Sequence, residues 1–398
     1  MAETFDVVIA GGAAMGSSVA YHLLADPAFQ GRVLVVEKDS TYRRSASALS
    51  AASIRQQFSS LVNIRISLHG IAFLRDIGER LAVDGERPEI GLTEGGYLYL
   101  ASQAGAGILA ENQALQRAEG ADIVLLDQGG LATRFPWLST GDLACGAWGR
   151  SGEGWFDGWA LLQAFRRKAR ALGAVYRTGA VAGVERQGGR ILAVTLDDGS
   201  RVGCGALVNC AGAGGRALAA QAGVDIPVFA KRRSVFSFTC GTPIEHGPLL
   251  IDTTGVWTRP EGEGFICGVS PGPGETDPDW IDDDPSTQDV DWAIFEERIW
   301  PALAHRVPAF EAIRPGRAWA GPYDMCALDH NAIIGLADGP SNLYLCNGFS
   351  GHGLQQSPTV GRGLAELIVH GRYVSLDLSA LGFFRVAADA PLRERNVI

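Results

Sequence analysis

The chain has 398 residues, of which 46% are hydrophobic, and a net charge of -10 at pH 7. A chain of this length buries a large core and normally forms two domains, while its acidity argues against nucleic acid or an anionic membrane surface as a partner. Uncharged apolar runs of about 18 residues do not occur, so we expect no membrane span.

The chain begins with a pattern of strand, glycine turn and helix. Residues 6–10 form a short apolar run typical of a buried strand, Gly11–Gly16 forms a tight turn, and residues 17–24 carry apolar side chains at helical spacing. A second apolar run, 32–36, ends in Glu37, about 20 residues beyond the turn, where a dinucleotide ribose needs an acceptor. The sequence therefore predicts a dinucleotide-binding βαβ unit.

The residue types of this turn have physical reasons. Gly11 allows the tight turn, and Gly16 lets the helix pack closely on the strand. The middle glycine of the usual G-x-G-x-x-G pattern is replaced by Ala13, whose methyl group is small enough if the backbone angles permit it. Glycine turns also close ordinary βα units, but the strand, the helix and the acid together favour dinucleotide binding.

Small and hydroxylated residues follow over Arg43–Phe58, where Arg55 interrupts a run suited to lie flat against a planar ligand. Apolar spacing then predicts one amphipathic helix over 63–81. Alternation predicts a strand over 95–100, which a helix over about 106–119 follows. This part of the chain is typical of an inserted domain.

A buried strand over 206–210 ends in a second glycine turn, Ala211–Gly215, at the strand end where open α/β sheets bind ligands. Four further strands predict an antiparallel sheet: residues 234–238, 249–251, 255–259 and 264–268. The adjacent acids Asp282–Asp284 could suggest a metal site, but without a cage of ligands we interpret them as a solvated loop and expect no metal.

The last part of the chain repeats the pattern of the first, with buried strands followed by a glycine-rich turn and a helix. Strands over 332–335 and 343–347 precede Gly348–Pro358, a glycine-rich turn that opens a helix reaching Val369. Glycines before a helix describe an anion site, here with His352 inside the turn.

The cysteines and the N-terminal residues indicate the cellular compartment in which the protein is expected. The seven cysteines are scattered without a C-x-x-C pair, which favours buried free thiols over disulfides or a zinc site. Glu3 and Asp6 lead directly into a strand with no basic segment before it, so we expect a cytoplasmic protein.

Together these elements resemble the D-amino-acid-oxidase-like superfamily of FAD oxidoreductases, in its sarcosine oxidase, dimethylglycine dehydrogenase and glycine oxidase branch. The most specific parts of the resemblance are the N-terminal turn, Ser53–Arg55, Val208–Gly212, Asp329–Gly335 and Gly348–Gly353. The resemblance implies an α/β fold, with a Rossmann-like FAD-binding domain and a discontinuous substrate domain built on a mixed, mainly antiparallel sheet. The FAD-binding domain would comprise residues 1–85, 145–230 and 325–398, and the substrate domain residues 86–144 and 231–324.

The resemblance also assigns cofactor contacts. Glu37 would bind the adenosine ribose, Val181 would lie against the adenine, and the helix that opens at Gly348–Gln355 would direct its dipole at the pyrimidine end of the flavin. The full set of implied FAD contacts is Gly11, Gly12, Ala13, Ala14, Met15, Gly16, Glu37, Lys38, Arg44, Ser45, Ser47, Ala48, Val181, Gly212, Gly348, Phe349, Gly351, His352, Gly353, Leu354 and Gln355.

The sequence departs from the family pattern where FAD is attached and where oxygen is activated. Pro322 matches the attachment cysteine of sarcosine oxidases, Cys326 lies about one turn later, and no histidine stands near Ser47, so we expect noncovalent FAD. The lysine that relatives place over the flavin is absent from Gly264–Gly268, and Gln355 replaces the lysine that helps to bind the substrate carboxylate.

Four residues are candidates for catalysis. Arg55 is the candidate carboxylate ligand because a guanidinium matches a carboxylate in two-point contact; the alternative is a structural ion pair. His352 could bind flavin or substrate or be a packed neutral histidine, and Tyr323 could line the cavity or belong to the core. Arg259 could be a second carboxylate contact if its strand faces the flavin.

These features predict FAD-dependent oxidation of a small secondary or tertiary amino acid, an N-substituted glycine such as sarcosine, dimethylglycine or iminodiacetate. The product would be an imine that hydrolyses to an amine and an aldehyde, and oxygen, a quinone or an electron-transfer protein would accept the electrons. The alternatives are oxidation of a cyclic or D-amino acid, and a flavin-binding assembly protein without turnover.

Overall fold

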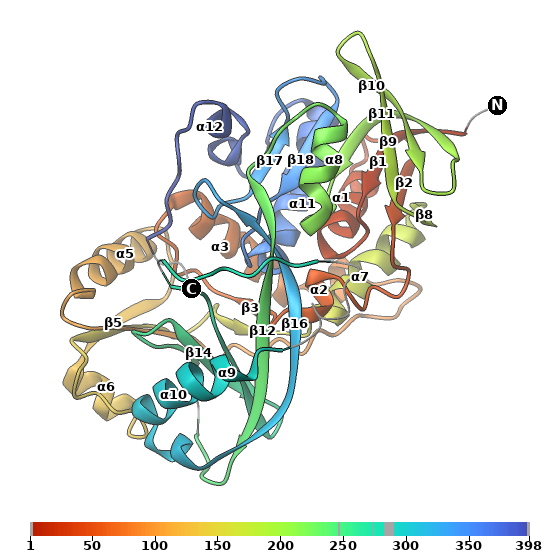
Figure 1. Cartoon of the computed structure of the whole chain (residues 1–398). Helices are drawn as coiled ribbons and strands as arrows, with labels where there is room; N and C mark the ends of the chain where they lie inside the picture. Colours follow the sequence, from red (N-terminus) through yellow and green to blue (C-terminus); the bar gives the residue numbers. More distant parts are fainter. Residues whose placement is uncertain (1–2, 246, 273, 282–289, 396–398) are drawn as a thin grey trace.

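The computed structural model describes residues 3–245, 247–272, 274–281 and 290–395, which form two sheets of eight strands each and a small two-stranded sheet (Figure 1). The acids Asp282–Asp284 lie outside these described residues. The α-helices of the described residues are α1 (Ala14–Ala25), α2 (Ala46–Leu49), α3 (Leu61–Arg75), α4 (Ile77–Arg80), α5 (Ala106–Ala118), α6 (Gln128–Arg134), α7 (Gly158–Ala171), α8 (Gly215–Gln221), α9 (Trp292–Ile294), α10 (Trp300–Arg306), α11 (Gly353–His370) and α12 (Phe384–Ala387).

The first sheet has the order β17-β18-β11-β1-β2-β8, with an antiparallel extension through β10 and β9. Its strands are β1 (Glu3–Ala10), β2 (Val33–Glu37), β8 (Val175–Thr178), β9 (Val181–Gln187), β10 (Arg190–Leu196), β11 (Arg201–Asn209), β17 (Ile333–Leu336) and β18 (Leu343–Asn347). Strand β1 is parallel to β2 and β11, and it is covered on both faces. Val7 and Ile9 pack into one core with α1, α7 and α11, whereas Val8 packs into a second core beneath α8 and β10. This double burial explains the continuous apolar run.

The second sheet has the order β16-β12-β15-β14-β13-β4-β6-β5. Its strands are β4 (Tyr97–Ala101), β5 (Ile123–Asp127), β6 (Cys145–Gly149), β12 (Val228–Cys240), β13 (Leu249–Ile251), β14 (Val256–Glu261), β15 (Gly264–Val269) and β16 (Ile313–Cys326). Only the β13–β4 pair is parallel among the described pairs of this sheet, so the prediction of a mixed, mainly antiparallel sheet is confirmed.

Strands β12 and β16 form a long antiparallel pair that runs from the level of the first sheet down through the second (Figure 1). Val228 and Cys326, which are register partners at one end, lie in the core of the first sheet, while Phe236 and Phe238 lie in the core of the second. The domain boundaries drawn from the sequence at 230/231 and 324/325 therefore fall inside one continuous strand pair. Strand β6 also lies in the second sheet, although the segment 145–230 was assigned to the first domain.

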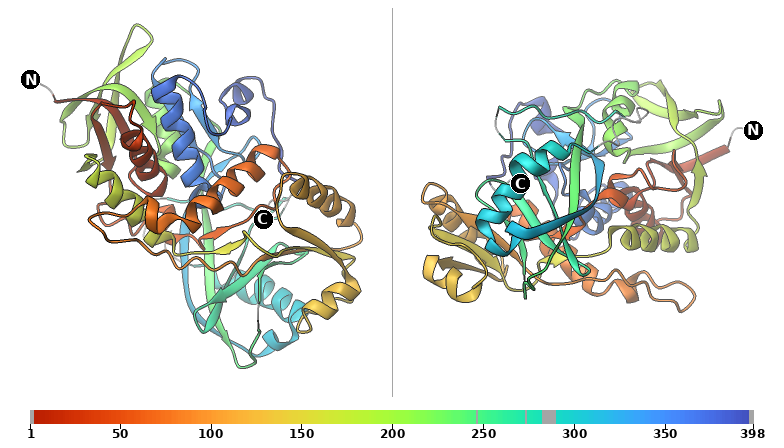
Figure 2. Two further views of the ribbon diagram at one scale, coloured as in Figure 1. Left: turned by 180° about the vertical axis from the view of Figure 1, so that it is seen from behind. Right: turned by 60° about the horizontal axis from the view of Figure 1, so that its bottom comes forward.

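The two ends of the chain meet in a helical layer, where α1, α11 and α3 lie side by side when the molecule is seen from behind (Figure 2). The Ser18 hydroxyl donates to the carbonyl of Ser357 at 2.7 Å. A Cβ on Gly361 would lie 2.2 Å from Ser18 Oγ, so this glycine permits the close packing. The prediction of one helix over 63–81 is wrong, because the backbone of Asp76 (φ -97°, ψ 10°) leaves the helical region between α3 and α4.

All seven cysteines are free, and six of them are buried. Within the described part of the chain, no helix is both long and apolar enough to cross a membrane. No group of His, Cys, Asp or Glu side chains in that same part has the arrangement of a metal site.

Candidate active site

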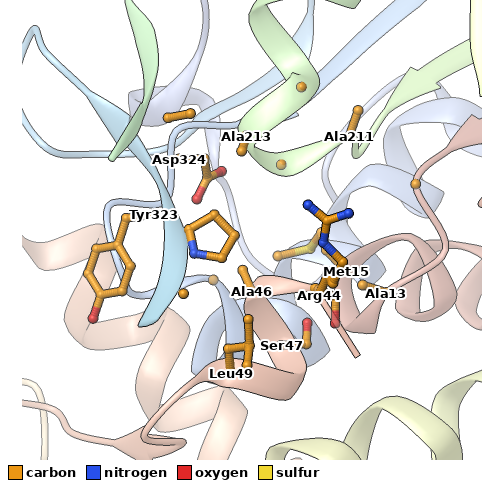
Figure 3. A pocket seen from close by; sticks show the side chains of 18 of the residues that line it. Ala13, Met15, Arg44, Ala46, Ser47, Leu49, Ala211, Ala213, Tyr323 and Asp324 are labelled. Atoms are coloured by element: carbon orange, nitrogen blue, oxygen red, sulfur yellow. The ribbon is translucent and has the colours of Figure 1, made fainter. Parts of the chain in front are cut away.

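Residues from both sheets line one cavity of about 440 Å³. The first sheet contributes the turns after β1 and β11 and the end of β2, and the second contributes strands β12, β14 and β16. The segment around α2 and the turn before α11 close the remaining sides. Figure 3 shows this arrangement, with Ala13, Met15 and Ala211 at one side and Tyr323 on its strand at the other.

The turn after β1 and the first turn of α1 each have a glycine at which no side chain would fit. Gly11 has a φ of +98°, and a Cβ there would lie 2.2 Å from the carbonyl oxygen of Cys210. A Cβ on Gly16 would lie 1.9 Å from the carbonyl oxygen of Gly11. Ala13, by contrast, has ordinary extended angles (φ -67°, ψ -164°), so its methyl group is accommodated without strain.

Glu37 ends β2 beside this turn. Its carboxylate accepts the backbone N–H of Gly12 at 2.8 Å and that of Asp39 at 3.0 Å. Burial raises the pKa of Glu37 above its ordinary value, and the two backbone donors oppose that effect. The carboxylate is therefore fixed in place at the cavity wall, with further acceptor capacity on both oxygens.

The residues of the glycine turn before α11 have two roles: some bind a carboxylate of the protein, and others line the cavity. The N–H groups of Gly348 and Phe349 donate to the carboxylate of Asp324, at 2.8 and 3.2 Å. Gly353 and Leu354, at the N-terminus of α11, line the cavity, where helical N–H groups have no partner within the helix. Part of the predicted anion site is thus occupied by a side chain of the protein itself.

Asp324 is a site residue that the sequence patterns did not indicate. The acid lies on β16, lines the cavity (Figure 3) and is half-buried, and desolvation raises its pKa to about 6. An acid two residues beyond Pro322 was the available signal, but only the fold shows that it faces the turn before α11.

Arg55 lies in a buried polar cluster and not among the residues that line the cavity. Its Nη1 donates to the carbonyl of Gln57 at 2.8 Å and to the Tyr99 hydroxyl, and its Nη2 lies 2.8 Å from Nε2 of His352. The backbone N–H of Arg55 donates to Oε1 of Gln355 at 2.9 Å. The structure therefore brings together Arg55, His352 and Gln355, three residues selected from the sequence.

His352 is neutral in this cluster. Burial and the adjacent charge of Arg55 hold the pKa of His352 well below its usual value. Because a guanidinium has only donors, Nε2 of His352 is the accepting nitrogen and the ring proton is on Nδ1.

A second residue that sequence reasoning missed, Glu153, supports the segment next to Arg55. Its carboxylate accepts the backbone N–H of Gln56 at 2.5 Å and of Gln57 at 3.1 Å, and the Gln57 side-chain amide at 2.8 Å. The side chain is completely buried, and burial raises the pKa of Glu153 to about 7. Its partners are 96 or 97 residues away in the chain, so no local pattern could reveal it.

Arg259 and Tyr323 have different positions. Arg259 donates to the carbonyl of Ala51 from Nε at 3.2 Å and from Nη2 at 2.6 Å, pairs with Glu261, and does not line the cavity. Tyr323 does line it, with its ring against Gly351, where a Cβ would lie 2.5 Å from the ring edge.

The family model for FAD-dependent oxidoreductases, named DAO, matches residues 6–367 of this chain. This chain belongs to the DAO family of FAD-dependent oxidoreductases. The FAD-dependent oxidoreductase domain-containing protein 1 of Xenopus laevis is 41% identical to it, over 100% of this chain and 85% of the relative. The mitochondrial sarcosine dehydrogenase of Mus musculus is 26% identical over 93% of this chain and 40% of the dehydrogenase. The solved L-proline dehydrogenase of P. horikoshii has the same fold, with a TM-score of 0.84 and 23% identity over 98% of this chain and 99% of that chain.

Membership of the DAO family confirms the resemblance inferred from the sequence and makes FAD the cofactor of an oxidoreductase. The cavity fits this cofactor, since a side-chain-free cradle, a fixed carboxylate at a strand end and a helix N-terminus all border it. Of the residues selected for cofactor contact or catalysis, those lining the cavity are Gly11, Ala13, Ala14, Met15, Glu37, Lys38, Arg44, Ser45, Ser47, Val181, Gly212, Tyr323, Phe349, Gly351, Gly353 and Leu354. The remaining residues are not among those that line it: Gly12, Gly16, Ala48, Arg55, Arg259, Gly348, His352 and Gln355.

Proposed function

We propose that this DAO-family protein oxidises the C–N bond of a small secondary or tertiary amino acid, an N-substituted glycine such as sarcosine, dimethylglycine or iminodiacetate. The observation that carries the proposal is the continuity of the cavity, which extends from the nucleotide turn at Gly11 to Tyr323 and Trp257 on the second sheet. A sarcosine dehydrogenase among the relatives supports the same substrate class.

FAD, when bound, supplies the two-electron acceptor for the hydride of the substrate C–H bond. The protein has to orient that bond, exclude water and keep the substrate amine unprotonated, because an ammonium nitrogen cannot assist departure of the hydride. Val235, Trp257, Val269 and Trp280 give the second-sheet end of the cavity an apolar lining. Such a lining lowers the pKa of a bound amine by desolvation, so the neutral amine is favoured there.

Anaerobic mixing of the purified FAD-loaded protein with a panel of amines tests the proposal. We expect the flavin absorbance to bleach with N-alkyl glycines and much less with glycine. Bleaching only with L-proline, pipecolate or a D-amino acid would favour oxidation of cyclic or D-amino acids instead. If no amine bleaches the flavin, the protein is a flavin-binding protein without this turnover.

The second half of the same experiment identifies the electron acceptor. After bleaching, the reduced protein is mixed in turn with oxygen, a soluble quinone and an electron-transfer flavoprotein, and the return of absorbance is timed. The natural acceptor class is the one that restores the absorbance at the highest second-order rate constant.

A further inference from the structure

A second buried arginine, Arg233 on β12, lines the cavity that Arg55 does not reach. Its side chain is 9% exposed, and its guanidinium lies 5.4 Å from the centroid of the Tyr323 ring. Its register partner on β16 is Gly321, which also lines the cavity and places no side chain beside the guanidinium. Arg233 is therefore a cation at the second-sheet end, where the substrate has to lie.

The hydrogen bonds of Arg233 are incomplete. Nη1 donates to the carbonyl of Arg232 at 2.9 Å and to the carboxylate of Asp277, and Nη2 donates to the other oxygen of Asp277 at 3.2 Å. Nε is buried and has no hydrogen-bond partner among the described residues. A buried guanidinium donor without an acceptor costs about 1–3 kcal/mol, so the pair with Asp277 does not satisfy this arginine.

Asp277 belongs to a segment that lies along β12, residues 274–281, which we call the strap. The strap is attached through its backbone: Arg232 N donates to the carbonyl of Pro278 at 2.9 Å, and Trp280 N donates to that of Ala230 at 3.0 Å. The Asp277 side chain is 30% exposed, more than three times the 9% of Arg233. The carboxylate of Asp277 can therefore rotate into water without moving the strap, whereas the guanidinium has to stay buried.

We propose that Arg233 binds the carboxylate of the amino acid substrate, and that Asp277 is its exchangeable counter-ion in the absence of substrate. An incoming carboxylate replaces Asp277 in two-point contact, so the buried cation is paired before and after the exchange. This arrangement rests on the proposed function, and it gives the site a preference for anionic over neutral amines. Arg55 then positions the segment beneath the site through its contacts with Gln57, Tyr99 and His352.

Equilibrium binding of methoxyacetate to the FAD-loaded protein, measured by titration calorimetry, tests the exchange without requiring turnover. Methoxyacetate has the shape and carboxylate of sarcosine but no amine to oxidise, and methoxyacetamide is its neutral counterpart. In Arg233→Gln we expect the Kd for methoxyacetate to rise about tenfold or more, with that for methoxyacetamide unchanged. In Asp277→Asn the internal competitor loses its charge, so the Kd for methoxyacetate should fall roughly fivefold or more.

Glu275→Gln is the matched control, because Glu275 is the other strap acid with an arginine partner, Arg298. Its Kd for methoxyacetate should stay within about twofold of the parent, since that pair does not line the cavity. An equal tightening in Glu275→Gln and Asp277→Asn would overturn the proposal, because loosening of the strap would then explain both. The gain expected for Asp277→Asn cannot arise from a misfolded protein.

Three further results would overturn the proposal: an unchanged Kd in Arg233→Gln, weaker binding in Asp277→Asn, or loss of FAD from Arg233→Gln, which would assign the arginine to the cofactor. The same measurements distinguish failure of this carboxylate site from failure of the proposed oxidation. Binding of methoxyacetate that depends on Arg233, in a protein that no amine bleaches, would keep the anion site and reject the oxidation. If sarcosine bleaches the flavin with the same apparent Kd in the parent and in Arg233→Gln, the oxidation is kept and the role of Arg233 as the carboxylate ligand is rejected.

Discussion

The buried charged residues Arg55 and Glu153 near the cavity are stabilised by different kinds of neutral groups. Arg55 donates to the neutral carbonyl of Gln57, lies beside the neutral ring of His352 and is 4.2 Å from the ring centroid of Phe58, so neutral groups contact its guanidinium. Glu153 accepts three hydrogen bonds from neutral N–H donors of Gln56 and Gln57. A carboxylate in that position is expensive to ionise, and its pKa is raised accordingly.

The raised pKa of Glu153 predicts a pH-dependent effect on stability. The folded protein retains a proton on Glu153 up to about pH 7, whereas the unfolded chain loses it near 4.5, so this group lowers the free energy of unfolding as the pH rises through that window. Glu153→Gln removes the titration and keeps an acceptor for the backbone N–H groups. We expect the variant to be more stable than the parent by on the order of 3 kcal/mol near pH 8, and about equal near pH 4.5. Urea unfolding of both proteins at both pH values measures the difference in unfolding free energy. An equal difference between variant and parent at the two pH values would contradict the expectation.

The glycines offer a second prediction at the level of single residues. Gly16→Ala forces a methyl group against the carbonyl oxygen of Gly11, so we expect a loss of roughly 2–4 kcal/mol in unfolding free energy and poor retention of FAD. Gly107→Ala, in the exposed first turn of α5, meets no atom within 4 Å. This control should gain about 0.5–1 kcal/mol, because alanine has less backbone entropy to lose. Thermal unfolding and the ratio of flavin to protein absorbance report both effects.

At the scale of elements, the turn before α11 depends on an acceptor supplied by β16. Asp324→Ala leaves the N–H groups of Gly348 and Phe349 without that acceptor, so we expect a loss of about 2–4 kcal/mol and a higher Kd for FAD. Asp324→Asn keeps one acceptor oxygen and should lose less than half as much. Fluorescence titration of the apoprotein with FAD gives the Kd. Equal Kd values in the parent and the alanine variant would show that the turn keeps its shape without Asp324.

The elements whose signals are local were predictable, and those that depend on distant partners were not. The strand, turn and helix around Gly11 are encoded within a few residues, and the structure has all three, although β1 begins at Glu3 and α1 at Ala14, each three residues before the predicted start. The break between α3 and α4 was missed because apolar spacing continues through Asp76. Arg55 was selected for its charge, but its partner His352 lies 297 residues away, so the sequence could not tell a cavity wall from a buried cluster behind it.

At the scale of the whole molecule, FAD should stabilise both sheets at once. The cavity is lined by turns of the first sheet and by β12 and β16, which continue into the core of the second. We expect one calorimetric transition, stabilised by about 2.7 kcal/mol when free FAD is a hundredfold above its Kd. Two transitions of which only one responds to FAD would mean that the long strand pair does not couple the sheets.

The whole cofactor should also be removable. Pro322 lines the cavity and has no nucleophile, while Cys326 is buried outside the lining, with its Sγ 3.7 Å from Oδ1 of Asp329. Acid precipitation should therefore leave a colourless pellet and a yellow supernatant. Flavin that stays with the pellet after washing would demonstrate a covalent link.

The helical layer has a consequence for the order of events in the cell. Ser18 on α1 and its acceptor Ser357 on α11 are 339 residues apart, an interval that a ribosome translating about 5–20 residues per second needs roughly 20–70 seconds to cover. During that time α1 emerges and waits without the helix that buries its face. Because Gly353 and Leu354 of α11 line the cavity, its walls are complete only after α11 has been made, so we expect FAD to bind after translation of α11.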